Sequence, residues 1–148
     1  MWDLHHFRLS FKQSYFEGYI ISRNDVILYP NLMIMKMYHN PSCSKSRICL
    51  EFLQAEKKDF ELVTYIKKPL TKEDLTALLS KLDMKPSELV RKNEMIFKEA
   101  GKSHVLSEEE ILQLMLENPK LIERPIVEVD GKAIVVRPIE RLKAFLQY

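Results

Sequence analysis

The chain has 148 residues, 46% of them apolar, and this length is sufficient to bury one hydrophobic core. Its formal net charge is only +2 and its basic and acidic residues are intermixed, which argues against a basic face for nucleic acid. The sequence contains no apolar run of the roughly 20 residues that a membrane helix needs, and no pattern of a secretory signal. We therefore expect a cytoplasmic protein without a membrane or nucleic-acid partner.

Residues 1–32 differ from the rest of the chain. Their aromatic residues are scattered without a sustained period. The following residues, 33–148, already have the elements of a small domain. We therefore expect the first 32 residues to reflect a misassigned start, with Met33 or Met35 as the true one. The alternative is a genuine extension that packs on the domain.

Residues 34–66 have the pattern of a β-α-β unit. Residues 34–38 predict a short buried strand, and residues 44–55 have apolar side chains at helical spacing. Residues 60–66 are rich in β-forming types. With the helix as the crossover, the two strands are expected to be parallel.

Residues 71–117 predict a helical insertion. Two capping boxes mark helix starts, and they are formed by Thr71 with Asp74 and by Ser107 with Glu110. Between these two helices, Ser87 is expected to cap a short helix over residues 88–92. The insertion separates the β-α-β unit from the last strands.

The last part of the domain predicts a hairpin and a helix. Asp130–Gly131 lies between two β-patterned segments, residues 126–129 and 133–136, which is a strong hairpin signal. Residues 141–146 predict a terminal helix. The fold class is therefore α/β, with helices around a mixed sheet of about four strands.

Cys43 is the first candidate for chemistry, because it precedes the helix that begins at Ser44. A thiol at a helix N-terminus faces unpaired N–H groups and the positive end of the helix dipole, which lower its pKa. The same N–H groups can bind an anion. Many cysteines only fill a core, but the polar neighbours of Cys43 do not resemble core residues.

The second cysteine, Cys49, lies among apolar residues and is expected to fill the core. A helix rises roughly 9 Å over six residues, which exceeds the ~7 Å between Cα atoms that a disulfide with Cys43 tolerates. Ser46 occupies the position at which a CxxC motif would carry its second thiol. The resolving thiol must therefore come from another molecule, such as glutathione or a partner protein.

Four segments of the chain carry a specific combination of motifs. They are His39-Asn40-Pro41-x-Cys43-x-x-Ser46-Arg47, Arg91-Lys92-Asn93, Glu123-Arg124-Pro125-Ile126-Val127 and Val136-Arg137-Pro138. Together they resemble the ArsC-type arsenate reductases, a glutaredoxin- and glutathione-dependent family. The resemblance covers about residues 34–146 and implies a thioredoxin-like fold with a helical insertion.

The resemblance implies that Cys43 is the nucleophile and that Arg91, Arg124 and Arg137 bind the substrate. Without the resemblance, each arginine would be interpreted as a solvated surface residue. A guanidinium presents paired donors that match a tetrahedral oxyanion, and it stays charged throughout the reaction. The three arginines are therefore expected to converge on Cys43.

Supporting roles are implied for His39 and Ser46. His39 would either support the thiolate or cap the loop, and Ser46 would either hydrogen-bond the Cys43 sulfur or pair with helix backbone. Pro125 matches a proline that is commonly cis in thioredoxin folds. Most X-Pro bonds are trans, however, and trans is the expectation from the sequence alone.

The implied activity is the reduction of arsenate to arsenite through a Cys43–arsenate adduct that glutathione and glutaredoxin resolve. No bound cofactor or metal is expected, glutathione is a co-substrate, and the protein is expected to be a monomer. The pair His5–His6 lacks further ligands at metal spacing and predicts exposed side chains.

Two alternatives stay open. The run Cys43-Ser44-Lys45-Ser46-Arg47 resembles paralogues of unsettled substrate, which favours a glutathione-dependent thiol oxidoreductase acting on another substrate. Spx-type regulators share the fold and bind RNA polymerase without catalysis. They switch through a CxxC pair, however, and Ser46 interrupts that pair here.

Overall fold

A computed structural model describes residues 15–16, 19–21, 26–28 and 35–146 of the chain. The chain divides into two compact units, Met1–Met33 and Ile34–Tyr148. No helix of the described residues is long and apolar enough to cross a membrane. His5 and His6 lie outside the described residues, so their predicted exposure stays a prediction.

The first unit contains a small antiparallel sheet. Its strands are β1 (Tyr15–Phe16), β2 (Tyr19–Ile21) and β3 (Val26–Leu28), paired in that order. The sequence predicted no element here, because strands of two or three residues are too short to show an alternating pattern. That residues 1–32 reflect a misassigned start stays a prediction.

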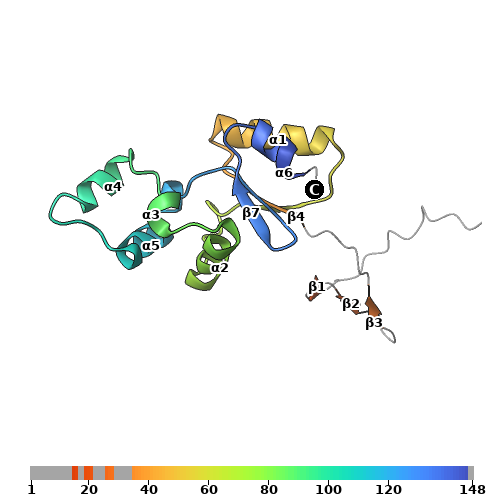
Figure 1. The fold of residues 1–148 in the computed structure, drawn as a ribbon, viewed down its shortest axis with the longest axis horizontal. Helices are drawn as coiled ribbons and strands as arrows, with labels where there is room; N and C mark the ends of the chain where they lie inside the picture. Colours follow the sequence, from red (N-terminus) through yellow and green to blue (C-terminus); the bar gives the residue numbers. More distant parts are fainter. Residues whose placement is uncertain (1–14, 17–18, 22–25, 29–34, 147–148) are drawn as a thin grey trace, which may run out of the picture. The chain divides into compact units, whose positions relative to one another are not determined.

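The second unit is built on a four-stranded mixed sheet of order β5-β4-β6-β7 (Figure 1). Its strands are β4 (Met35–Tyr38), β5 (Glu61–Val63), β6 (Ile126–Val129) and β7 (Lys132–Val135). Strands β4 and β5 are parallel, and β6 is antiparallel to both β4 and β7. The predicted α/β fold, with α1 (Ser44–Ala55) as the crossover, is confirmed.

Strand β5 is shorter than the sequence predicted, because a turn follows it. The carbonyl of Thr64 accepts hydrogen bonds from the N–H groups of Lys67 and Lys68, at 3.0 and 3.1 Å. The N–H of His39 donates to the carbonyl of Val63 at 2.9 Å, which extends the contact between the two strand ends. The turn takes Tyr65 out of the strand and leaves it at the end of the sheet.

The predicted hairpin joins β6 and β7. Asp130 and Gly131 have φ angles of 49° and 77°. Both values lie in the left-handed region that a tight two-residue hairpin turn requires, and Asp-Gly is favoured there. Strand β7 begins one residue before the predicted start, at Lys132.

Helices cover both faces of the sheet (Figure 1). On one face, α1 and α6 (Glu140–Phe145) pack on the strands, and on the other face, α2 (Lys72–Leu82) does so. The first core contains Met35, Met37, Cys49, Leu53, Val127, Val136 and Leu142. Tyr38 and Ile126 belong to the second core, as the alternation of side chains along a strand requires.

The insertion consists of α2 (Lys72–Leu82), α3 (Pro86–Leu89), α4 (Met95–Ala100), α5 (Glu108–Glu117) and a 3₁₀ turn, η1 (Pro119–Leu121). Both predicted capping boxes are present, at the starts of α2 and α5. The predicted cap at Ser87 is wrong. Helix α3 already begins at Pro86, a residue type favoured at the first helical position, and the Ser87 hydroxyl donates to Glu108 at 2.6 Å.

Candidate active site

The candidate site lies at one edge of the sheet, where three chain segments meet. The loop after β4 carries Cys43, the segment before β6 carries Arg124, and the segment after β7 carries Arg137. In the sheet register, β4 ends opposite the start of β6, and the start of β6 lies opposite the end of β7. Pairing therefore brings together residues that are up to 94 positions apart.

Cys43 occupies the N-cap position of α1, with extended backbone angles, and its thiol is half-buried. Its N–H donates to the carbonyl of Asn40 at 3.0 Å, which fixes the loop. Burial acts to raise the pKa of Cys43, but hydrogen bonds from the N–H of Ser46 and from the Arg124 side chain outweigh it. The pKa is lowered from its ordinary value, which favours the thiolate.

Two guanidinium groups lie at the Cys43 sulfur. Nη2 of Arg137 is 4.0 Å from Sγ, and its Nε donates to the carbonyl of Arg124 at 2.7 Å. The Arg124 side chain acts on the thiol to lower its pKa, and it donates to the carbonyls of Lys120 and Ile122. The two arginines are therefore linked to each other and to the thiol.

Arg91 lies beside Arg124 and not at the sulfur. Its Nη1 is 3.5 Å from the carbonyl of Lys120, which also accepts from Arg124. Its side chain forms an ion pair with Glu94, at 2.6 Å. An isolated β-bridge between Val90 and Ile122 holds the two arginine segments together. The structure thus brings all three predicted arginines to one region, with two of them at the thiol.

His39 and Ser46 support the loop. The hydroxyl of fully buried Ser46 accepts from the N–H of Asn40 at 3.0 Å and lies 3.1 Å from Nδ1 of His39. Burial lowers the pKa of His39, a hydrogen bond with Ser46 acts in the opposite direction, and the charge of Arg47 lowers the pKa further. The lowered pKa disfavours the charged form of His39, and its contact with Ser46 agrees better with a role in the loop than with a charge beside the thiolate.

Both X-Pro bonds at the site are cis. They are the bonds Arg124–Pro125 and Arg137–Pro138. The expectation of a trans bond, based on the frequency of trans X-Pro bonds, is therefore wrong for Pro125. The bond has the cis conformation that the family resemblance implies. The carbonyl of Pro125 accepts from the N–H of Val136 at 2.8 Å, which joins the two arginine segments.

Cys49 is fully buried in the core formed with α1. Burial raises the pKa of Cys49 to about 12, so that it stays a thiol at neutral pH. Its predicted role as a core residue is confirmed. The described part of the chain contains no group of three His, Cys, Asp or Glu side chains that could hold a metal ion.

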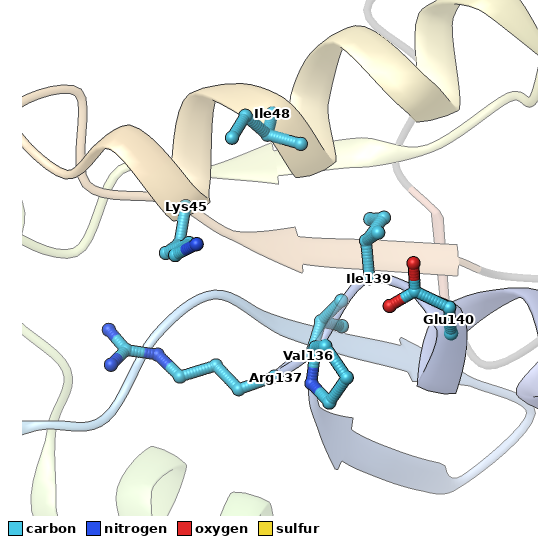
Figure 2. A pocket seen from close by; sticks show the side chains of 7 residues that line it. Lys45, Ile48, Val136, Arg137, Ile139 and Glu140 are labelled. Carbon is cyan, nitrogen blue, oxygen red and sulfur yellow. The ribbon is translucent and has the colours of Figure 1, made fainter.

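A groove of about 390 Å³ lies between α1 and the segment that follows β7 (Figure 2). Its lining residues are Lys45, Ile48, Val136, Arg137, Pro138, Ile139 and Glu140. Figure 2 shows the side chains of Lys45 and Arg137 at the same end of this groove. Because Arg137 also contacts the Cys43 sulfur, a molecule in the groove lies close to the thiol.

Two polar side chains at this edge were not predicted from the sequence. Oε2 of Glu123 is 3.6 Å from Nη1 of Arg137. Tyr65 is 1% exposed, and the charges of Arg124 and Cys43 act on its hydroxyl. A signal existed for both, since Glu123 directly precedes Arg124 and Tyr65 follows the strand parallel to β4.

Comparison with known proteins agrees with this architecture. Residues 38–145 match the ArsC family. An arsenate reductase of Neisseria meningitidis serogroup A is 35% identical over 114 residues, which cover 76% of this chain and 97% of that protein. The uncharacterized protein YfgD of Escherichia coli K12 is 44% identical over 110 residues, 73% of this chain and 92% of that protein.

A solved arsenate reductase from Vibrio cholerae is similar in structure, with a TM-score of 0.70 and 36% identity over 77% of this chain and 98% of that chain. The fold and the site define a thioredoxin-like protein with one activated cysteine. The chain belongs to the ArsC family, which includes arsenate reductases.

Proposed function

We propose that the protein reduces arsenate to arsenite with Cys43 as the nucleophile. The observation that carries the proposal is the position of Cys43 at the N-terminus of α1, with Arg124 and Arg137 at its sulfur. An anionic thiolate that attacks an anionic substrate needs positive charge to offset the repulsion. The two guanidinium groups and the N–H groups of α1 supply that charge.

In the first step, the Cys43 thiolate forms a bond to As(V) and a water molecule leaves. Arg124 and Arg137 bind the arsenate oxygens, and Arg91 extends the cationic region on the side of Arg124. Glutathione then forms a second sulfur–arsenic bond with loss of another water molecule. The arsenic at this stage is still As(V), held between Cys43 and glutathione.

The reduction follows when a glutaredoxin thiolate attacks the glutathione sulfur. The glutathione–arsenic bond breaks, and its electron pair passes to arsenic, so that As(V) becomes As(III). The other product is the mixed disulfide of glutaredoxin and glutathione. Water then releases arsenite from Cys43. Cys49 cannot replace the external thiol, since its buried thiol has a pKa of about 12.

The groove beside Cys43 is where we expect glutathione to approach. Lys45 offers an exposed ammonium group for a glutathione carboxylate, and Ile48 and Pro138 offer apolar contacts. The dependence on glutathione and glutaredoxin implies a reducing compartment, the cytoplasm. We also propose that the protein acts as a monomer.

Arsenite formation by the purified protein with arsenate, glutathione and glutaredoxin tests this function. We expect turnover by the natural chain and none by Cys43→Ser. Cys49→Ala, the matched change at the buried thiol, retains turnover because Cys49 takes no part in the reaction. A natural chain without arsenite formation, or a Cys43→Ser variant as active as the natural chain, would contradict the proposal.

A second candidate is a glutathione-dependent thiol oxidoreductase that acts on a less charged substrate. The observation in its favour is the carboxylate of Glu123, 3.6 Å from Arg137, which offsets part of the positive charge at the site. Reduction of glutathione mixed disulfides without arsenite formation would support this candidate. The Spx-type alternative has less support, because Ser46 stands at the position of the second thiol.

A further inference from the structure

Tyr65 is a buried tyrosine without a hydrogen-bond partner for its hydroxyl among the described residues. Only 1% of the residue is exposed. Leaving a hydroxyl buried and unpaired is unfavourable, so buried tyrosines ordinarily have a partner. Tyr38, another buried tyrosine of this unit, follows that rule, since its hydroxyl donates to Glu128 at 3.0 Å. The unpaired hydroxyl of Tyr65 therefore calls for an explanation.

Charged groups of the candidate site act on the pKa of the Tyr65 hydroxyl. Burial is the main cause that raises the pKa of Tyr65 to about 12, and the charges of Cys43 and Glu123 raise it further. The charges of Arg124 and Arg91 act in the opposite direction. These four residues all belong to the site, and the parallel pairing of β4 and β5 places Tyr65 at the same sheet edge as Cys43.

Two more buried atoms in the same region have no hydrogen-bond partner within the described residues. They are Nε of Arg124 and Oε2 of Glu123, the second of which forms an ion pair with Arg137 at 3.6 Å. Tyr65 and Arg124 thus each hold an unused donor, and both lie near Cys43. A tetrahedral oxyanion presents several acceptor oxygens and can accept from both donors at once.

We propose that the Tyr65 hydroxyl donates a hydrogen bond to an oxygen of the oxyanion bound at Cys43, next to the Arg124 guanidinium. This inference rests on the proposed function, because it requires an oxyanion at the thiol. Tyr65 is then a substrate-binding residue that adds a donor without adding positive charge. With a pKa of about 12, the hydroxyl keeps its proton at neutral pH and remains a donor.

The test compares Tyr65→Phe with Tyr38→Phe in the full chain. Both variants remove one buried phenolic oxygen, and only Tyr65 lies at the site. The measured quantity is the arsenate concentration that halves the rate of Cys43 alkylation by iodoacetamide. We expect Tyr65→Phe to need about 10-fold more arsenate than the natural chain, the effect of losing a hydrogen bond to a charged group. Tyr38→Phe is expected to need the same concentration as the natural chain.

Thermal unfolding supplies a second measurement, which distinguishes a contact with the substrate from a purely structural role of Tyr65. Loss of an unpaired hydroxyl leaves the melting temperature of Tyr65→Phe unchanged or higher, whereas Tyr38→Phe loses a hydrogen bond and melts earlier. An equal half-protective concentration for Tyr65→Phe and the natural chain would overturn the inference and leave the proposed function standing. An equal increase in both variants would also overturn it. A natural chain that arsenate does not protect would overturn the proposed function, and the inference with it.

Discussion

At the scale of single residues, the environment of Cys43 sets the pKa of its thiol. Burial of the thiol opposes ionisation, and hydrogen bonds from the N–H of Ser46 and from Arg124 reverse this effect. Arg137 adds a second guanidinium 4.0 Å from the sulfur. Cys49 has no such donors among the residues that the structure describes, and burial raises its pKa to about 12. The pKa of the same residue type is therefore lowered at one position and raised six residues later.

The contribution of Arg124 to the lowered pKa of Cys43 can be measured with the variant Arg124→Gln. The substitution removes the charge and the hydrogen bond that lower the pKa of Cys43, so the pKa rises. A smaller thiolate fraction at neutral pH then slows alkylation of Cys43 by roughly 3- to 10-fold. Arg141→Gln, at an exposed position of α6, removes the same charge from a residue that is not among the causes of the lowered pKa of Cys43, and it serves as the control. Equal alkylation rates in Arg124→Gln and the control would refute this assignment.

The sequence predicts Cys43 better than it predicts the residues around it. The place of Cys43 before an amphipathic helix carries a physical signal, the N–H groups of a helix N-terminus. Arg91, Arg124 and Arg137 carry no such signal, and only the family resemblance identified them. Tyr65 was missed because an aromatic residue after a strand is normally a core residue.

At the scale of the elements, α1 serves both the thiol and the neighbouring groove. Its N-terminus faces the Cys43 sulfur, and its exposed residues Lys45 and Ile48 line the groove toward the segment after β7. One helix therefore positions Cys43, the proposed nucleophile, and lines the groove at which we propose that glutathione approaches. Its bounds, Ser44–Ala55, agree with the sequence prediction, since the apolar spacing and the N-terminal serines are local signals.

Reversal of charge at Lys45 tests the groove as the glutathione site. We expect Lys45→Glu to raise the KM for glutathione by roughly 3- to 10-fold, since an exposed charge pair contributes modestly. Protection of Cys43 by arsenate changes much less, because Lys45 lies on the groove side of the thiol. Lys58→Glu makes the same change at an exposed residue that follows the C-terminal end of α1. If both variants raised this KM equally, a general charge effect would replace the groove as the explanation.

Several element boundaries could not be predicted from local patterns. Strand β5 ends at Val63 because the carbonyl of Thr64 organises a turn, whereas the β-rich composition continues to Ile66. Helix α3 starts at Pro86, one residue before the serine expected to cap it. In both cases a turn or a proline overrides a weaker propensity.

At the scale of the whole molecule, the sheet register assembles the site. The segments that carry Cys43, Arg124 and Arg137 are distant in sequence and adjacent at one sheet edge. Local sequence patterns contain no information about such distant pairs. The prediction of a mixed four-stranded sheet was correct because strand patterns and the β-α-β rule are largely local, with a fixed handedness.

Glu128 connects this sheet to the insertion. The residue is 5% exposed, and its carboxylate accepts hydrogen bonds from Tyr38 at 3.0 Å and from Lys81 of α2 at 2.6 Å. We expect Glu128→Ala to lower the free energy of unfolding by about 2 kcal/mol, because it leaves a buried hydroxyl and a partly buried ammonium without a partner.

Urea unfolding of Glu128→Ala and Glu61→Ala measures this contribution. Glu61 forms a surface ion pair with Lys36 at 3.3 Å, and its loss is expected to cost less than about 1 kcal/mol. Similar losses in the two variants would show that the buried network does not hold α2 on the sheet.

The pH dependence of Cys43 alkylation, measured with and without arsenate, tests the central claim most directly. A lowered pKa means that a larger fraction of Cys43 is thiolate at a given pH and that the rate falls as the pH drops through this lowered value. We predict a midpoint below that of a free cysteine, and suppression of the rate by arsenate on the thiolate side of the midpoint. An ordinary midpoint together with a rate that arsenate leaves unchanged would contradict the account.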